Sequence, residues 1–302
     1  MRRPIRNCVG LVIFLVAIAA AFYTQRVRIG DLIGESAAPE LPAAMAYKET
    51  AAAVPVVGQP VIERSVIDEA IPVDEKIAAS PAAPRNDTVA SLPPPNPLSS
   101  EAPAPGAKDG SIPSSFNLAV PFTSQAPFSN WDAVHEETCE EAAIYMVASF
   151  YEGVTGKVDP TVAEAELQRL VAIENATFGY YKDTTADETA RLAKLAYGYS
   201  RVDLLDDPTA DQIKAFVASG HPVIVPTAGR MLHNPNFTGD GPPYHMVVIR
   251  GYADTQFVTN DPGTRRGEAY VYSIDTVMAA AHDWNGGDVE NGKKVMIVTY
   301  PL

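Results

Sequence analysis

The chain has 302 residues, of which 46% are hydrophobic, and a formal net charge of −14. This length allows one or two domains, and the acidic balance excludes a typical nucleic-acid-binding protein, which needs clustered Lys and Arg to bind phosphates. Two cysteines, Cys8 and Cys139, are too few for a disulfide framework or a cysteine-based zinc site. We expect no metal and no cofactor.

Residues 1–30 contain an uncharged, mostly apolar run from Asn7 to Gln25, at the short end of the length of a membrane-spanning helix. Arginines flank the run on both sides, and those at the N-terminus slightly favour a cytoplasmic N-terminus. The run predicts a single-pass membrane anchor. The alternative is a signal peptide cleaved near the small residues 17–21, which would release a secreted protein. Both alternatives place the remaining chain outside the cytoplasm.

Residues 31–115 hold more than half of the 26 prolines of the chain and a single aromatic residue, Tyr47. Such a composition cannot build a hydrophobic core and favours extended conformations, so we expect a disordered, Pro/Ala-rich linker. Aromatic residues become frequent from Phe116 onward. Residues 116–302 are numerous enough to bury a core of their own, and we expect them to form one domain.

Hydrophobic periodicity predicts helices in the first part of this domain and strands in the second. A short strand is expected at 118–122, ahead of the helices. The expected helices are 138–151, one opening at Asp159-Pro160, one beginning at Thr185 or Asp187, 208–219, and a late helix at 274–284. The expected strands of an antiparallel sheet are 222–228, 245–253, 256–260, 267–273 and 293–300. Helices followed by strands indicate an α+β fold.

Cys139 falls at the start of the first predicted helix, where unpaired backbone amides favour an anion and lower a thiol pKa. The same residue also suits a small buried hydrophobe. Four glutamates surround it in the stretch HEETCEEAAIYM, and their charge opposes a thiolate. Because Glu140 and Glu141 lie in the first helical turn, we expect one to point toward solvent and the other along a cleft.

A thiol nucleophile needs a base, which is usually a histidine oriented by a third group. Among the five histidines, His245 begins a predicted strand directly after a loop, and Asp261 ends the next strand. Side chains at linked positions on adjacent strands can come within hydrogen-bonding distance. This order of residues follows the logic of a Cys–His–Asp triad. The alternative is a histidine at the start of a strand followed by an ordinary NDPG turn.

Four segments resemble the C39-like cysteine peptidases: VPFTSQ, TCEEAAIYMVASFYEG, YHMVVIRGY and VTNDPG, in this order. The resemblance covers essentially all of 116–302 and implies a papain-like fold. It also implies Cys139 as nucleophile, His245 as base, Asp261 as its orienting group and Gln125 in the oxyanion hole. Glu140-Glu141 stands where many members carry Gly-Pro. The chain lacks the phosphate loop of the members fused to an ABC exporter, so their leader-peptidase role is not transferred.

These features predict an extracytoplasmic thiol peptidase or amidase that acts on peptides or cell-wall peptides through an acyl-enzyme. We expect a monomer held at the cell membrane by its N-terminal helix, without a nucleic-acid partner. The first alternative is a catalytically inactive papain-like module, tethered to the membrane, that binds peptides or cell-wall material. The second is a structural surface protein in which the linker is the essential part.

Further candidates for substrate binding lie around these motifs. Trp131 suits either a wall of the cleft or the core, and Glu140 and Tyr244 adjoin the proposed nucleophile and base in the sequence. The loop 228–244 precedes His245 directly. Its length suits either a flap over the cleft or a tolerated surface insertion.

Overall fold

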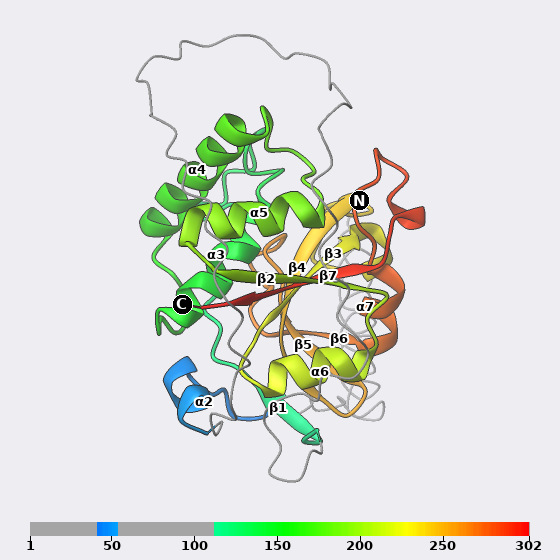
Figure 1. Cartoon of the computed structure of the whole chain (residues 1–302). Coiled ribbons are helices and arrows are strands. Elements are labelled where there is room, and N and C mark those ends of the chain that lie inside the picture. The colour runs from blue at the N-terminus through cyan, green and yellow to red at the C-terminus, as the bar shows by residue number, and fades with distance from the viewer. Residues whose placement is uncertain (1–40, 54–111, 302) are drawn as a thin grey trace, which may run out of the picture. The chain divides into compact units, whose positions relative to one another are not determined.

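The computed structural model describes residues 41–53 and 112–301, with side chains from 41–50 and 112–301 (Figure 1). The predicted anchor or signal peptide at 1–30 and most of the predicted linker lie outside the described residues. The chain divides into two compact units, 1–41 and 42–302, and the description below concerns the second. Within the described ranges, no helix combines the length and apolarity that a membrane span requires.

One antiparallel sheet forms the centre of the domain. Its strand order is β2-β7-β3-β4-β5-β6, and β1 pairs with the far end of β4. The strands are β1 (Ser115–Asn117), β2 (Arg201–Asp206), β3 (Val223–Ala228), β4 (Tyr244–Ala253), β5 (Gln256–Asn260), β6 (Tyr270–Ser273) and β7 (Val295–Tyr300). All of β4 except its last residue is buried. This strand is covered on both faces, which explains its nearly continuous apolar sequence.

Helices pack on this sheet, so the predicted α+β class is confirmed. The elements are α2 (Tyr47–Ala53), α3 (Cys139–Tyr151), α4 (Pro160–Thr177), α5 (Ala186–Tyr197), α6 (Ala210–Ala218), α7 (Ile274–Ala280), and the 3-10 turns η1 (Gly229–Leu232) and η2 (Val289–Asn291). Helices α3, α4 and α5 lie together (Figure 1) and α3 packs on β4.

Local capping explains where several helices begin. Asp159 accepts hydrogen bonds from the first amides of α4, and Pro160 is the first residue of that helix, as predicted. Thr185 opens α5 with a reciprocal capping box that includes Glu188. Helix α3 differs, because Thr138 makes no side-chain cap. Nearly all of α3 is buried, which fits a helix that runs through the core.

Three predictions about the chain's organisation need correction. The short strand expected at 118–122 is β1 at 115–117, and strand β2 was not predicted. Residues 45–53, placed in the disordered linker, form a bridge and helix α2 on the domain: the amide of Met45 donates to the carbonyl of Asn117 at 2.9 Å. Tyr47 packs against Phe150 and Tyr151 at the end of α3. Tyr47, the single aromatic residue of this proline-rich stretch, therefore packs α2 against the end of α3.

Candidate active site

His245 and Asp261 are joined by a direct hydrogen bond in the core of the domain. The Nε2 atom of His245 lies 2.8 Å from Oδ1 of Asp261. His245 is the second residue of β4, and Asp261 follows the last residue of β5. These strands pair as an antiparallel hairpin in which Val248 lies opposite Asn260, so the two side chains meet beyond the paired residues. The sequence order of strand, hairpin and strand thus brings them together.

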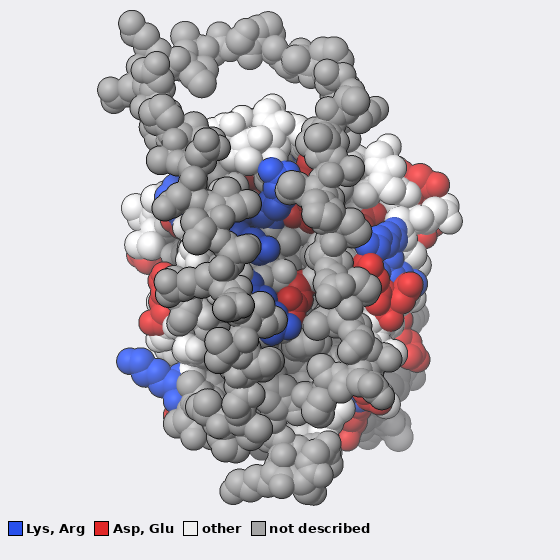
Figure 2. All heavy atoms as spheres, viewed as in Figure 1, with Lys and Arg blue, Asp and Glu red and all other residues white. Residues whose placement is uncertain are grey.

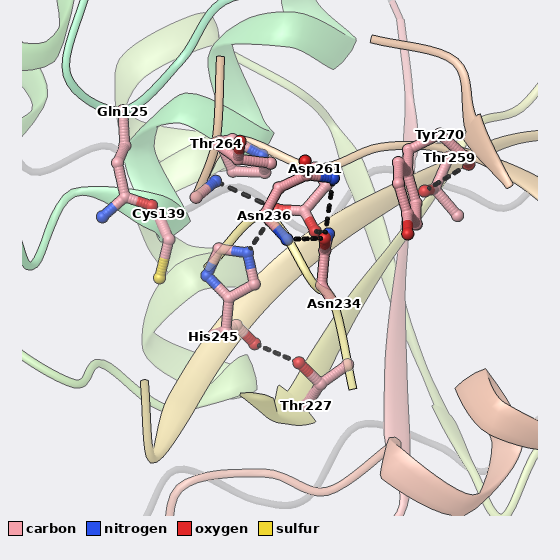
Figure 3. A network of polar contacts seen from close by, with 12 residues as sticks. Gln125, Cys139, Thr227, Asn234, Asn236, His245, Thr259, Asp261, Thr264 and Tyr270 are labelled. Atoms are coloured by element: carbon pink, nitrogen blue, oxygen red, sulfur yellow. Dashed lines mark hydrogen bonds and ion pairs between the residues drawn. The ribbon is translucent and has the colours of Figure 1, made fainter. Parts of the chain in front are cut away.

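Cys139 lies on the other side of the imidazole. Helix α3 packs against β4, and its first residue is Cys139. Figure 3 shows the ring of His245 between the sulfur of Cys139 and Asp261, with its second nitrogen toward the sulfur. Because Nε2 is engaged with Asp261, that second nitrogen is Nδ1. Among the described residues, no hydrogen bond joins Cys139 to His245; the thiol has a different partner.

That partner is Glu140. The thiol of Cys139 donates to Oε2 of Glu140 at 3.0 Å. Burial raises the pKa of the Cys139 thiol well above its usual value, and the charge of Glu140 raises it further. A hydrogen bond from the backbone of Met246 acts in the opposite direction. In this structure the thiol is therefore held in its protonated form.

The glutamates of the first turn of α3 do not point as expected. Glu140 and Glu141 are both buried, with 1% and 0% of their surface exposed. A third buried carboxyl group, that of Glu174 on α4, lies close to them. Burial raises the pKa of all three, and the charge of Glu174 adds to the effect on the other two. The helix enters the core at its first turn, so neither side chain reaches solvent.

Asp261 is the most extensively bonded member of the site. Its Oδ2 atom accepts hydrogen bonds from Asn234 at 2.9 Å and Tyr272 at 2.6 Å, and its Oδ1 atom accepts from the amide of Gly263 at 3.0 Å. Burial alone would raise its pKa, but His245, Tyr272 and Asn234 lower the pKa of Asp261 overall. The residue is therefore a carboxylate that fixes the position of the imidazole.

Asn234 and Tyr272 were not predicted as site residues. Asn234 belongs to the loop before His245, and Tyr272 to β6, which borders β5. Their role follows from tertiary contacts between elements that are separate in the sequence. The only available signal was the position of Asn234 in the long loop that precedes His245, because polar side chains in such loops often serve a site.

Gln125 is close to the site but is oriented away from an oxyanion role. Its Nε2 atom donates to the carbonyl of His135 at 2.9 Å, and its buried Oε1 atom has no hydrogen-bond partner. In Figure 3 the amide oxygen, rather than the nitrogen, lies on the Cys139 side. Its backbone is tied to Thr138 and Pro262, the neighbours of Cys139 and Asp261. The main chain is thus in place, whereas the amide would have to turn to donate to an oxyanion.

Of the further candidates for substrate binding, one lines a pocket and two are buried. Trp131 is 40% exposed and lines a pocket of about 630 Å³, together with residues of the loop 228–244 and of the loop after Asp261. Tyr244 is buried, and its hydroxyl lies within hydrogen-bonding distance of the carbonyl of Thr184, at 3.0 Å, and of Oδ1 of Asp283, at 3.1 Å. Tyr244 is therefore a core residue, and Glu140 contacts the thiol without lining the pocket.

Three of the other histidines contact residues other than Cys139 and Asp261. His135 bridges Asp132 and Glu164, each at 2.8 Å. Burial lowers the pKa of His221 to about 4, and His282 contacts the carbonyl of Gly292. In the described part of the chain, no group of three or more His, Cys, Asp or Glu side chains could hold a metal ion.

Comparison with known proteins gives the family. Residues 117–287, more than half of the chain, match the model of the Peptidase_C39 like family. The chain belongs to this family. One similar solved structure is a crystal structure from Bacillus anthracis, provisionally assigned as a C39-like peptidase. It shares 18% identity with a TM-score of 0.42, over 62% of this chain and 98% of that chain. No curated protein matches the chain significantly.

Membership of the Peptidase_C39 like family assigns this domain to the cysteine peptidases at the level of the family. The matched residues begin at β1 and include Cys139, His245 and Asp261, so the bonded His–Asp pair lies within the family's domain. The pair and the thiol occupy the region where helix α3 meets strand β4.

Proposed function

We propose that this C39-like domain is a thiol peptidase or amidase that cleaves a peptide bond through an acyl-enzyme on Cys139. The observation that carries the proposal is the position of His245, which is bonded to Asp261 through Nε2 and turns Nδ1 toward the sulfur (Figure 3). A ring held in this way can remove a proton from the thiol and hold it.

The chemical steps follow from this geometry. Nδ1 of His245 takes the thiol proton, and the sulfur forms a bond to the carbonyl carbon of the substrate. The imidazolium, stabilised by Asp261, then gives this proton to the leaving nitrogen as the C–N bond breaks. Water, deprotonated by the same imidazole, attacks the thioester and releases the acid and the thiol.

Two local changes must precede the first step. The Cys139 thiol has to leave the carboxylate of Glu140, since that contact favours the protonated sulfur. The amide of Gln125 has to turn from the carbonyl of His135 so that it can donate to the oxyanion with the backbone amide of Cys139. Both residues are buried, so we propose that substrate binding triggers these changes.

We further propose that the enzyme acts outside the cytoplasm, on peptides or cell-wall peptides, as a monomer at the cell membrane. The apolar run at 7–25 supports this placement, because either a membrane anchor or a signal peptide would export the domain. The proline-rich chain between that run and the domain would allow the domain to act at a distance from the membrane.

A second candidate function is a binding module that retains the peptidase fold without catalysis. The raised pKa of Cys139 favours it, because a protonated thiol is a poor nucleophile. Such a module would hold peptides equally well after Cys139→Ala and would never form a thioester.

Covalent labelling of the thiol distinguishes the two. We expect full-length protein in detergent to be labelled at Cys139 by a peptidyl acyloxymethyl ketone at pH 7–8, with His245→Ala reducing the rate at least 100-fold. Labelling should disappear in Cys139→Ala. A thiol that reacts no faster in the folded protein than in urea, together with no hydrolysis of peptide libraries or cell-wall fragments, would favour the binding module.

A further inference from the structure

The pocket beside His245 has a basic wall formed by one short loop. Residues 261–267 connect β5 toward β6, and two exposed arginines, Arg265 and Arg266, line the pocket. Trp131 and the loop residues Pro235, Asn236 and Thr238 line the rest of it. The loop 228–244, predicted as a flap or an insertion, therefore borders a pocket at the site.

The loop 261–267, which carries the two arginines, is held directly by the backbone of Asp261. The amide of Asp261 donates to the carbonyl of Gly267 at 2.9 Å, which closes the loop at its base. A Cβ atom on Gly267 would collide with the carbonyl oxygen of Asp261, so this close approach requires glycine. The amide of Arg266 also donates to the hydroxyl of Thr264. The position of the arginines is thus coupled to that of Asp261.

These arginines have no acidic partner among the described residues. Elsewhere on the domain basic side chains are often paired, as Arg201 is with Asp203 and Lys293 with Asp206, and red and blue side chains intermix on the face in Figure 2. Two acids close in sequence to the pocket residues are occupied: Asp132 binds His135, and Glu268 binds Lys157. Within 41–53 and 112–301, the single polar contact of the two guanidinium groups is a 3.4 Å contact of Arg266 with Asn236. Two unpaired guanidinium groups beside an aromatic ring suit a carboxylate ligand.

The chemistry of the site fixes which end of the substrate enters this pocket. Gly263 lines the pocket, and a Cβ atom added to it would be 2.8 Å from Cε1 of His245. The imidazole thus lies directly behind a residue that lines the pocket, and no atom of Cys139 is among the nearest neighbours of that position. Because the imidazolium delivers its proton to the leaving nitrogen, the residues on the leaving side of the cleaved bond extend from His245.

We propose that Arg265, Arg266 and Trp131 bind a carboxylate on the leaving-group side of the substrate, carried by an acidic side chain or by a free C-terminus. This inference rests on the proposed peptidase function and adds the substrate class to it. Arg265 and Arg266 supply charge, and Trp131 supplies an apolar surface for the adjoining chain.

A two-part experiment on the full-length protein in detergent tests this. The first part measures kcat/KM on a fluorogenic peptide library in which each position after the cleaved bond carries Asp or Asn, and each peptide ends in a free acid or an amide. We expect a preference of about tenfold for the carboxylate, lost in Arg265→Gln/Arg266→Gln. The control Arg191→Gln/Lys194→Gln removes the same charge from α5 and should keep the preference.

The second part measures binding without turnover. Cys139→Ala protein is titrated with Ala-Ala-Asp and Ala-Ala-Asn, each as acid and amide, and tryptophan fluorescence reports binding. Tighter binding of the Ala-Ala-Asp amide than of the Ala-Ala-Asn acid assigns the carboxylate to the acidic side chain, and the reverse order assigns it to the free C-terminus. The double arginine variant should abolish the difference. Peptide cleavage without any carboxylate preference would overturn this inference and leave the peptidase intact. Equal binding of all four tripeptides would overturn it even if no hydrolysis is found.

Discussion

The thiol of Cys139 donates a hydrogen bond to the carboxylate of the next residue, Glu140, at 3.0 Å, within the core of the domain. A carboxylate in this position stabilises the protonated sulfur and opposes its ionisation. The contact arises because α3 enters the core at its first turn, which leaves the side chain of Glu140 no route to water.

Removing this charge should activate the thiol. We expect Glu140→Gln to lower the pKa of Cys139, because it deletes the second-largest cause of the raised value and keeps the shape of the side chain. The rate of iodoacetamide alkylation against pH measures this pKa. The exposed Glu136→Gln serves as control and should leave the profile unchanged. An unchanged profile in Glu140→Gln would mean that Glu140 is already protonated in the resting protein.

Asp261 accepts hydrogen bonds at both oxygens, so an amide cannot replace it. In Asp261→Asn, the NH₂ group must face either His245 and Gly263 or Asn234 and Tyr272, all of which donate. If it faces His245, the proton of the imidazole moves to Nδ1, which can then no longer take the thiol proton. We expect kcat/KM to fall by about 10³–10⁴.

Tyr272→Phe is the matched variant, because it removes one donor and keeps the carboxylate. We expect a loss of stability of about 1 kcal/mol and a change in kcat/KM of less than about tenfold. The ¹⁵N chemical shifts of His245 should report the changed tautomer in Asp261→Asn alone. Full activity of Asp261→Asn would remove Asp261 from the proposed mechanism.

The state of Gln125 in turnover can be measured separately from that of the thiol. If its amide turns to the oxyanion, Gln125→Ala should lower kcat by about 10²–10³. The alkylation rate of Cys139 should stay nearly constant, because that reaction develops no oxyanion. An unchanged kcat would show that the amide remains on the carbonyl of His135 throughout catalysis.

Periodicity and capping patterns predicted most elements of this domain because their signals are local. Asp159-Pro160 and Thr185 mark helix starts by hydrogen bonds to amides two or three residues away. Strand β2 was missed because its alternation is weak and its partner, β7, is far away in the sequence. The contact between His245 and Asp261 could be predicted from their positions on adjacent strands, whereas the contacts of Asn234 and Tyr272 depended on tertiary structure.

The burial of Glu140 and Glu141 was predicted wrongly for a related reason. Acidic residues in a first helical turn are usually solvated and stabilise the helix dipole. The sequence has no local feature that distinguishes a helix entering the core from one at the surface. The apolar residues recur on one face of α3, yet the opposite face is covered as well, by α4 and α5.

The buried carboxyl group of Glu174 predicts how stability depends on pH. Burial raises its pKa from the ordinary value of 4.5 to about 7. A carboxyl with a higher pKa in the folded state binds more protons when folded, so stability is complete below pH 4.5 and falls as pH rises through 7. We expect Glu174→Gln to remove up to about 3 kcal/mol of this loss, since each pKa unit corresponds to about 1.4 kcal/mol. Urea unfolding at pH 5 and pH 8 measures the difference, with the exposed Glu136→Gln as control. If wild type and Glu174→Gln lose equal stability between these pH values, another group carries the dependence.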